Sequence, residues 1–279
     1  MIDGHGTEKA ILVDSTRCTA CRACQIACKQ WNQNPAERTT NLGSYENPPS
    51  LGSNTWMRIL FNEHFNGQMS WLFTKHQCMH CTDAACVEVC PSGATKHEKF
   101  NLADGSIIKR VATDPKKCIG CNYCRAVCPF DVPGYNQKKK GVYRCTLCLD
   151  RVSNAMDGYD TPACVKACAP GALLFGGRQE LLYRAELKVE QLKKAGVAEA
   201  QVYGKDQLGG LRYLYVLSAS PEKYALPVNP SVPASVKLWK SMARPYGGLA
   251  AVGLVAAMVV NGVINARNRG LEEKNKLDK

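Results

Sequence analysis

The chain has 279 residues, 16 of them cysteine, and a formal charge of +12 at pH 7. This length allows one large domain or two smaller ones with a hydrophobic core. The cysteines fall into four compact groups of four, and cysteines three residues apart are poorly placed to bridge each other. The composition therefore argues against a small secreted scaffold held together by disulfides.

The first cysteine group follows a short apolar segment, residues 10–14, which predicts a strand. Its members are Cys18, Cys21, Cys24 and Cys28. Three cysteines at intervals of three, with a fourth on the turn beyond, are typical of a [4Fe–4S] cluster loop. The fourth cysteine of such a run ligates the other cluster in two-cluster ferredoxins. The run therefore predicts two neighbouring clusters.

The next segment reads as a loop and then a hairpin. Residues 34–54 contain Gly43, Pro48, Pro49 and Gly52, which predicts a loop. Residues 56–61 and 69–75 alternate between apolar and polar side chains as strands do, with a turn at residues 66–67.

Three further cysteine groups follow, the second and third each ending just before a proline. They are Cys78, Cys81, Cys86 and Cys90; Cys118, Cys121, Cys124 and Cys128; and Cys145, Cys148, Cys164 and Cys168. The pattern from Asp14 to Cys28 recurs from Asp114 to Cys128, and residues 85–94 resemble residues 163–172. This internal repeat predicts a doubled ferredoxin-like unit of α+β class.

The C-terminal third holds three predicted elements. Apolar residues at helical spacing predict an amphipathic helix over residues 178–195, closed by Gly196. Residues 211–219 are rich in Leu, Tyr and Val and predict a strand. Four prolines in residues 221–236 predict an extended linker rather than a helix.

Residues 247–266 carry no formal charge and are long enough, at about 1.5 Å per residue, to cross a bilayer core. We expect a single transmembrane helix over about residues 246–266. Lys and Arg are more frequent after this segment than before it, so the positive-inside rule places the C-terminus in the cytoplasm and the cluster domain outside it. Residues 1–14 lack the features of a secretory signal.

Other functional classes fit the sequence less well. A cubane with four thiolates carries about −2, so four of them reduce the formal charge of +12 to about +4 and remove the main argument for nucleic acid. A zinc-binding nucleic-acid protein remains a remote alternative, because a tetrahedral zinc site has no need of the third cysteine in each run. No nucleotide-binding loop, Ser/His/Asp set or carboxylate pair stands out, so we expect no catalysis by the chain alone. His80 is either a donor to a cluster sulfur or a residue of the loop surface.

The spacing leaves open which cysteine groups share clusters. Adjacent pairing joins the first group with the second and the third with the fourth, whereas nested pairing joins the second with the third and the first with the fourth. Both schemes use every cysteine. Pro91 and Pro129 follow the last cysteine of the second and third groups, which favours nested pairing.

Several segments carry a family resemblance. They are residues 28–33 (CKQWNQ), 43–49 (GSYENPP), 78–81 (CMHC), 118–121 (CIGC), 142–148 (VYRCTLC), the 178–196 helix, and the terminal apolar segment preceded by residues 238–240 (LWK). Through them the chain resembles, over nearly its whole length, the iron–sulfur (beta) subunit of membrane-bound respiratory formate dehydrogenase. Related subunits of other molybdopterin reductases, and of some hydrogenases, share the cysteine array and are the alternative. The segments around Trp31 and Tyr45 favour formate dehydrogenase. Two features depart from the common pattern: Ala169 after Cys168, and a long Cys148–Cys164 spacer.

The resemblance implies nested pairing and four [4Fe–4S] clusters. Their ligands would be Cys18, Cys21, Cys24 and Cys168 for the first; Cys28, Cys145, Cys148 and Cys164 for the second; Cys78, Cys81, Cys86 and Cys128 for the third; and Cys90, Cys118, Cys121 and Cys124 for the fourth. The four-cluster domain would span residues 1–176, with an outer module (1–75 with 141–176) and an inner module (76–140). Residues 177–236 would hold the helix, strand and linker, and residues 237–279 the membrane anchor.

The resemblance also implies a role and partners. The chain would be a non-catalytic electron-transfer subunit between a molybdopterin-containing catalytic (alpha) subunit, with molybdenum or tungsten, and a membrane cytochrome b (gamma) subunit that reduces quinone. It would be held in the lipid bilayer of a bacterial inner membrane by its C-terminal helix. The cluster domain would lie on the periplasmic side, exported with its partner subunit, and no nucleic acid would be bound.

Overall fold

The computed structural model describes residues 7–41, 43–65, 67–154, 160–238, 241 and 253–265. The chain divides into two compact units, Met1–Val232 and Pro233–Lys279. All the cysteines belong to the first unit. In its described residues, this unit has a mixed α/β fold with one four-stranded sheet and three two-stranded hairpins.

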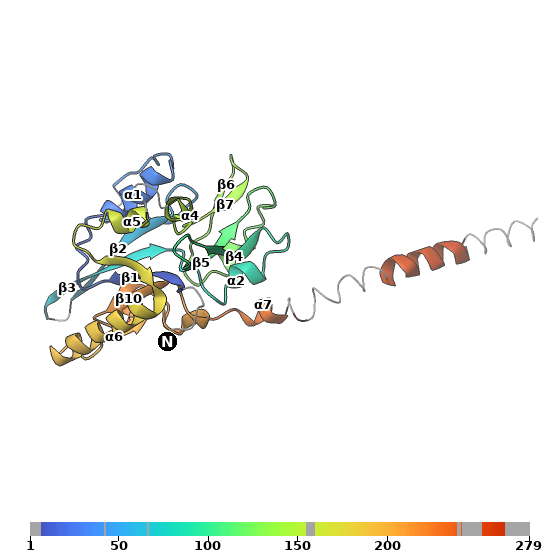
Figure 1. Cartoon of the computed structure of the whole chain (residues 1–279). Coiled ribbons are helices and arrows are strands. Elements are labelled where there is room, and N and C mark those ends of the chain that lie inside the picture. Colours follow the sequence, from blue (N-terminus) through green and yellow to red (C-terminus); the bar gives the residue numbers. More distant parts are fainter. Residues whose placement is uncertain are drawn as a thin grey trace, which may run out of the picture. The chain divides into compact units, whose positions relative to one another are not determined.

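The central sheet has the strand order β8-β1-β10-β9. Its strands are β1 (Lys9–Asp14), β8 (Leu173–Gly177), β9 (Gln201–Tyr203) and β10 (Tyr213–Leu217). The predicted strand at residues 10–14 is thus confirmed, and it pairs antiparallel with β8 and parallel with β10 (Figure 1). The predicted strand at residues 211–219 is confirmed in a shorter form.

The two faces of this sheet pack against different parts of the first unit, because side chains alternate along a strand. Ala10 and Leu12 of β1, with Leu214 and Val216 of β10, pack against the helix α6 (Arg178–Lys194). On the opposite face, alternate residues of the same strands join the core that holds several cysteines, among them Ile11, Val13, Tyr213 and Tyr215. The predicted helix at residues 178–195 is therefore confirmed, and it covers the face away from the cysteines (Figure 1).

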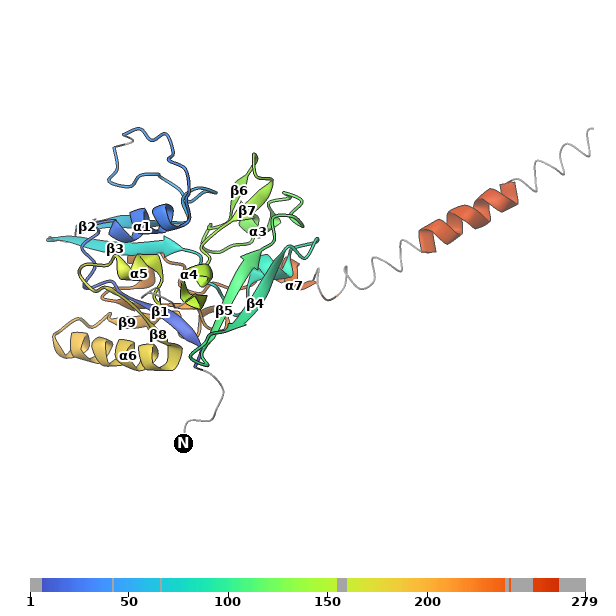
Figure 2. The same cartoon turned by 45° about the horizontal axis from the view of Figure 1, so that its top comes forward.

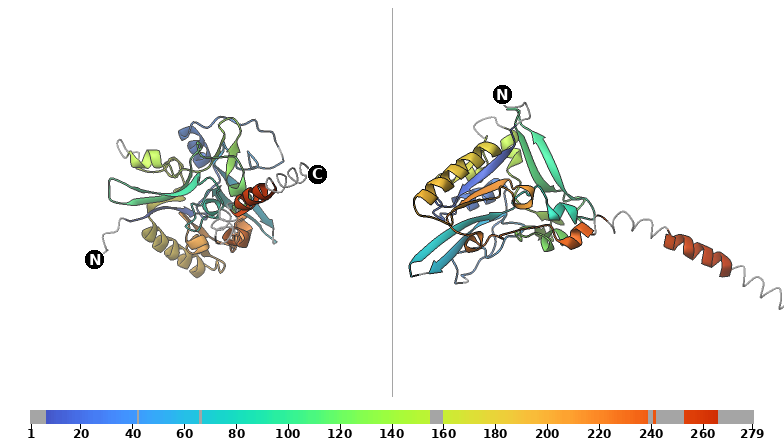
Figure 3. Two further views of the ribbon diagram at one scale, coloured as in Figure 1. Left: turned by 90° about the vertical axis from the view of Figure 1, so that its right-hand side faces the viewer. Right: turned by 90° about the horizontal axis from the view of Figure 1, so that it is seen from below.

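Three antiparallel hairpins complete the first unit. They are β2 (Met57–Phe65) with β3 (Met69–Gln77), β4 (Thr95–Asn101) with β5 (Ile107–Thr113), and β6 (Gly134–Asn136) with β7 (Gly141–Tyr143). The first of these confirms the predicted hairpin. Seen from below, β2–β3 and β4–β5 extend in different directions from the central sheet (Figure 3, right).

Short helices accompany the cysteine groups. They are α1 (Ala23–Trp31), α2 (Ala85–Glu88), α3 (Tyr123–Ala126), α4 (Leu149–Ser153) and α5 (Ala163–Lys166). The helices α1 and α5 pack against each other although more than a hundred residues separate them in sequence (Figure 2). Cysteines from distant groups are brought together in this way.

The sequence repeat is also present in the backbone. The N–H of Asp14 donates to the carbonyl of Ala172, and the N–H of Asp114 donates to the carbonyl of Ala94, both at 2.8 Å. In each copy the Asp carboxylate accepts a hydrogen bond from the N–H two residues on, at 3.0 and 2.9 Å. Both cysteine loops therefore begin with the same turn, closed by the same hydrogen bonds.

The linker predicted at residues 221–236 is only partly extended. A 3-10 helix, η3 (Pro221–Tyr224), and a short helix, α7 (Ala234–Leu238), interrupt it. Pro221 stands at the start of η3, where a helix needs no N–H donor, so the proline allows the helix rather than preventing it.

In the second unit, residues 253–265 form a helix with exposed apolar side chains such as Leu254, Met258 and Val263. Within the described ranges, none of the helices has the length and apolar character needed to cross a membrane. Of the span expected at residues 246–266, only residues 253–265 lie within the described part of the chain.

Candidate iron–sulfur cluster sites

Four thiols from the first and fourth cysteine groups line one cavity. Cys18, Cys21 and Cys24 come from the loop after β1 and the start of α1, and Cys168 follows α5. Arg22 has a left-handed backbone (φ 61°) immediately before α1, which turns the loop into the helix. The cavity thus collects three thiols from a tight loop and one from the far end of the cysteine array.

A second cavity collects the thiols of Cys28, Cys145, Cys148 and Cys164. Cys28 lies in α1 and Cys164 in α5, and the packing of these two helices brings them to the same cavity. Cys28 therefore lies apart from the other cysteines of its own run. Its neighbours come from a group more than a hundred residues away.

The second and third cysteine groups also meet. Burial raises the pKa of the Cys81 thiol well above its ordinary value, and the charges of three neighbouring thiolates raise it further. These neighbours are Cys78 and Cys86 of the same group and Cys128 of the third group. The thiols of the third expected ligand set therefore lie near one another and come from both groups.

In the described contacts, three members of the fourth expected ligand set lie near one another, and the remaining member, Cys90, has other partners. Burial raises the pKa of Cys124 to about 11, Arg144 opposes this, and the nearby thiolates of Cys86, Cys121 and Cys118 add to it. Cys90 accepts a hydrogen bond from the N–H of Thr95 at 3.4 Å. The contacts described for Cys90 are with Thr95 and Ser92 rather than with the other three thiols.

Lys75 lies between the first two cavities. It is the residue that the linings of both cavities share within the described part of the chain, and its exposed fraction is 2 %. Its Nζ donates to Oε1 of Gln77 at 3.1 Å and lies 4.6 Å from the ring centre of Tyr213. Burial lowers the pKa of Lys75, but the thiolates around it, led by Cys164 and Cys24, outweigh this and raise it.

Arg144 holds the corresponding place beside the third and fourth sets. Its Nη1 donates to Sγ of Cys86 at 3.3 Å, and its Nη2 donates to Oγ1 of Thr113 at 2.9 Å. Its exposed fraction is 5 %. Burial lowers the pKa of Arg144, and the nearby thiolates, Cys86 first and then Cys78, more than reverse that effect.

Tyr213 is a site residue that the sequence patterns place only in a strand. Its hydroxyl lies 3.4 Å from Sγ of Cys145, and its ring stacks on that of His80 at 6.4 Å between centroids. Burial raises the pKa of the Tyr213 phenol, and the Cys145 and Cys164 thiolates raise it further, so the O–H is the donor to sulfur. No spacing rule links Tyr213 to a cysteine loop. Its alternation along a buried strand was the sole available signal.

His80 has a ring N–H group that lacks a hydrogen-bond partner among the described residues. Its Nδ1 accepts a hydrogen bond from the N–H of Val111 at 3.0 Å, which assigns the ring proton to Nε2. That Nε2 is buried and has no hydrogen-bond partner among the described residues. Burial lowers the pKa of His80 well below its usual range, and Arg144 and other nearby arginines add to this. A neutral, buried N–H between two cysteines is the donor that a cluster sulfur would accept.

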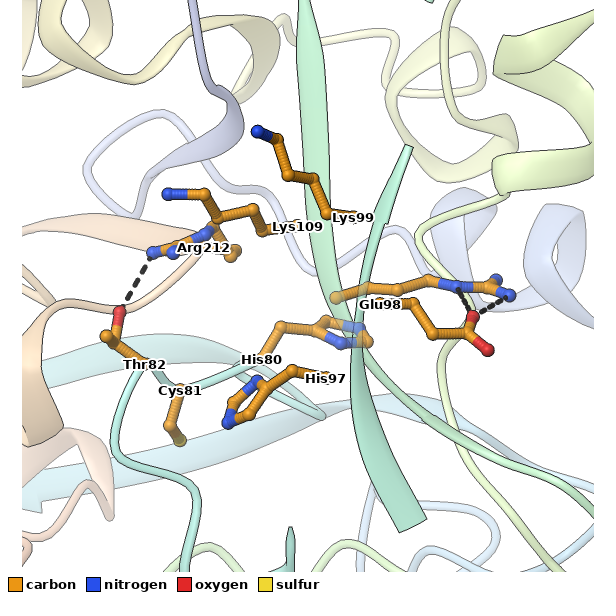
Figure 4. A pocket seen from close by; sticks show the side chains of 9 residues that line it. His80, Cys81, Thr82, His97, Glu98, Lys99, Lys109 and Arg212 are labelled. Atoms are coloured by element: carbon orange, nitrogen blue, oxygen red, sulfur yellow. Dashed lines mark hydrogen bonds and ion pairs between the residues drawn. The ribbon is translucent and has the colours of Figure 1, made fainter. Parts of the chain in front are cut away.

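A basic pocket lies beside His80 and Cys81 (Figure 4). It has a volume of about 280 Å³, and Lys99, Lys109 and Arg212 contribute to its lining. Arg110 forms an ion pair with Glu98 at 2.9 Å, and Arg212 forms one with Glu8. The cationic groups around these cysteines fit a region that holds anionic clusters.

The side chains fit [4Fe–4S] clusters by their chemistry as well as their spacing. Thiolates are the ligands that such clusters take. Burial raises the pKa of Cys24 to about 12, with Lys75 opposing it, so a positive metal centre is needed to hold the thiolate. The N–H of Leu147 donates to Sγ of Cys145 at 3.4 Å. Hydrogen bonds of this kind set cluster potentials.

Comparisons with known proteins agree with this chemistry. Residues 69–178 match the model of a 4Fe-4S dicluster domain. The iron-sulfur subunit of the nitrate-inducible formate dehydrogenase of Escherichia coli is 41% identical over 256 residues, which are 90% of this chain and 82% of that protein. The chain belongs to the formate dehydrogenase iron–sulfur subunits. Two further relatives are the formate dehydrogenase-O iron-sulfur subunit of E. coli (37% identical, 97% of this chain, 88% of that protein) and the formate dehydrogenase iron-sulfur subunit of Haemophilus influenzae (39% identical, 92% and 80%).

As a formate dehydrogenase iron–sulfur subunit, the chain transfers electrons through [4Fe–4S] clusters and is not the catalytic subunit. This assignment decides against the zinc-binding nucleic-acid alternative. It also decides in favour of formate dehydrogenase over the related reductases and hydrogenases that share the cysteine array.

Proposed function

We propose that this subunit carries electrons through four [4Fe–4S] clusters, from a molybdopterin-containing catalytic subunit to a membrane cytochrome b and quinone. The observation that carries the proposal is the cavity lined by Cys28, Cys145, Cys148 and Cys164. It takes one cysteine from the first run and three from the fourth group, as nested pairing requires.

The proposed ligand sets are those that the resemblance implies. The first is Cys18, Cys21, Cys24 and Cys168; the second is Cys28, Cys145, Cys148 and Cys164; the third is Cys78, Cys81, Cys86 and Cys128; and the fourth is Cys90, Cys118, Cys121 and Cys124. The first two sets are supported by the two cavities and the third by the thiols around Cys81. For the fourth, the proximity of Cys118, Cys121 and Cys124 is the support, and Cys90 is assigned by resemblance.

The order of the sets along the first unit is supported by electrostatic interactions between cysteines of neighbouring sets. Burial raises the pKa of Cys24, Lys75 lowers it, and Cys164 of the second set raises it. Similarly, burial raises the pKa of Cys78 of the third set, Arg144 lowers it, and Cys145 of the second set raises it further. We infer that the clusters follow one another as a chain from the first set to the fourth.

The protein's own contribution is burial, positioning and charge. When bound, each cluster supplies a reversible one-electron site. The cysteine loops and the packing of α1 on α5 bring the proposed ligand thiols together, and the apolar side chains of β1 and β10 exclude water from their surroundings. Buried Lys75 and Arg144 stabilise added negative charge.

We also infer a modular organisation and a membrane location. The outer module would be residues 1–75 with 141–176, the inner module residues 76–140, and the anchor residues 237–279. The support for an anchor is the uncharged sequence at residues 247–266 and the apolar side chains of the helix at residues 253–265. The chain would cross a bacterial inner membrane once, with its clusters on the periplasmic side.

The test compares formate-dependent electron transfer by the purified complex with that by the isolated subunit. The complex, purified in mild detergent, should couple formate oxidation to quinone reduction, whereas the isolated subunit should accept electrons from dithionite but none from formate. Formate-dependent dye reduction by the pure subunit would contradict the proposal. Co-purification without a molybdopterin subunit would contradict it as well.

A further inference from the structure

Two buried cations occupy comparable places in the two halves of the cysteine array. Lys75 lines the cavities of both the first and the second ligand set. Arg144 donates a hydrogen bond to Cys86 of the third set, and Cys124 of the fourth set packs in the same buried cluster as Cys86. Each cation therefore lies beside two neighbouring ligand sets.

Neither cation has a carboxylate partner among the described ion pairs. The Nζ of Lys75 is bonded to the neutral amide of Gln77 and faces the ring of Tyr213. The guanidinium of Arg144 is bonded to Thr95, Thr113 and a cysteine sulfur, and its Nε has no partner in the described part of the chain. A buried charge is unfavourable without an opposite charge. Cysteine sulfurs surround both cations, so anionic clusters held by these cysteines would supply the opposite charge.

Each cation also comes from a segment of the chain that leads into the cysteines of the other pair of ligand sets. Lys75 lies at the end of β3, which leads into the cysteines of the third set, yet it lines the cavities of the first and second. Arg144 directly precedes Cys145 of the second set, yet it bonds to Cys86 of the third. Each pair of sets thus receives its positive charge from the strand or loop that enters the other pair.

We propose that Lys75 and Arg144 are shared counter-charges, each of which raises the reduction potentials of both clusters in its pair. This inference rests on the proposed four-cluster function. An added electron makes a cluster more negative, so a cation held nearby in a low-dielectric interior stabilises the reduced form more than the oxidised form. A cation between two clusters acts on both at once.

The experiment is a potentiometric titration of the complex followed by electron paramagnetic resonance, with iron counted in every sample. The variant Lys75→Met removes the charge and keeps the length of the side chain, Lys75→Arg keeps the charge, and Lys193→Met removes an exposed charge at the end of α6 as the matched control. We expect Lys75→Met to lower two of the four potentials. At fixed potential, the ratio of reduced to oxidised cluster should fall about tenfold or more for both, which is about 59 mV for a one-electron couple.

Lys75→Arg and Lys193→Met should leave all four potentials near the wild-type values. Arg144→Met should lower the other two potentials, the pair that Lys75→Met does not change. If Lys75→Met and Lys75→Gln lose iron from one pair of clusters and Lys75→Arg restores it, the shared counter-charge is also supported, because charge alone is then the requirement.

Two results would overturn the inference. One is that Lys75→Met leaves every potential unchanged, and the other is that it moves a single cluster. A wild-type iron content well below about sixteen atoms, four for each of four clusters, would instead refute the proposed function itself. Iron content and potentials together therefore separate a failure of the inference from a failure of the function.

Discussion

At the scale of single residues, hydrogen bonds and charges around the cysteines distinguish sites that have the same ligands. Cys145 is contacted by the Tyr213 hydroxyl and by the N–H of Leu147. Cys86 is contacted instead by the guanidinium of Arg144. Because such contacts tune cluster potentials, the sites are expected to differ in potential despite their identical thiolate ligands.

The variant Tyr213→Phe should lower the potential of the cluster held by Cys145 and leave the iron content unchanged, because it removes one donor to sulfur and keeps the ring. A hydrogen bond to a charged group contributes about 1.5–3 kcal/mol. Since both oxidation states keep part of this energy, we expect the reduced-to-oxidised ratio at fixed potential to fall by up to about tenfold. Tyr183→Phe, at an exposed position of α6, is the control. An unchanged potential in Tyr213→Phe would show that the contact with Cys145 does not reach the cluster.

At the scale of elements, local sequence patterns were sufficient to predict those strands and helices whose periodicity and turn residues lie within one segment. The strand at residues 10–14, the β2–β3 hairpin and α6 were predicted because periodicity and turn residues are local. The parallel pairing of β10 with β1 was not predictable, since it joins segments about two hundred residues apart and depends on tertiary packing. The η3 helix was missed because Pro221 was read as a breaker although it stands at a helix start.

The terminal segment can be tested as an element of its own. Deleting residues 246–279 should leave the iron content and the cluster spectra unchanged, because every cysteine lies before residue 169. The deletion should release the complex from membranes or uncouple it from quinone, because the apolar segment is the proposed anchor. Fractionation and quinone assays of the truncated complex provide the measurement. Normal sedimentation with membranes together with normal quinone reduction would contradict the anchor.

At the scale of the whole molecule, cysteines that are far apart in the sequence line the same cavities. The spacing predicted all sixteen candidate ligands, but it left adjacent and nested pairing open, because ligand counts are the same in both. The packing of α1 on α5 brings Cys28 and Cys164 to one cavity, and spacing alone does not reveal that contact. The sequence does not distinguish Lys75 and Arg144 from exposed basic residues, because their burial depends on the tertiary fold.

The most direct test of nested pairing compares three variants of the complex by electron paramagnetic resonance: Cys28→Ser, Cys145→Ser and Cys18→Ser. Cys28 and Cys145 line one cavity, whereas Cys18 lines the other. We expect Cys28→Ser to alter or lose the same signal as Cys145→Ser and to retain the signal that Cys18→Ser loses. Loss of the Cys18 signal in Cys28→Ser, with the Cys145 signal intact, would contradict nested pairing.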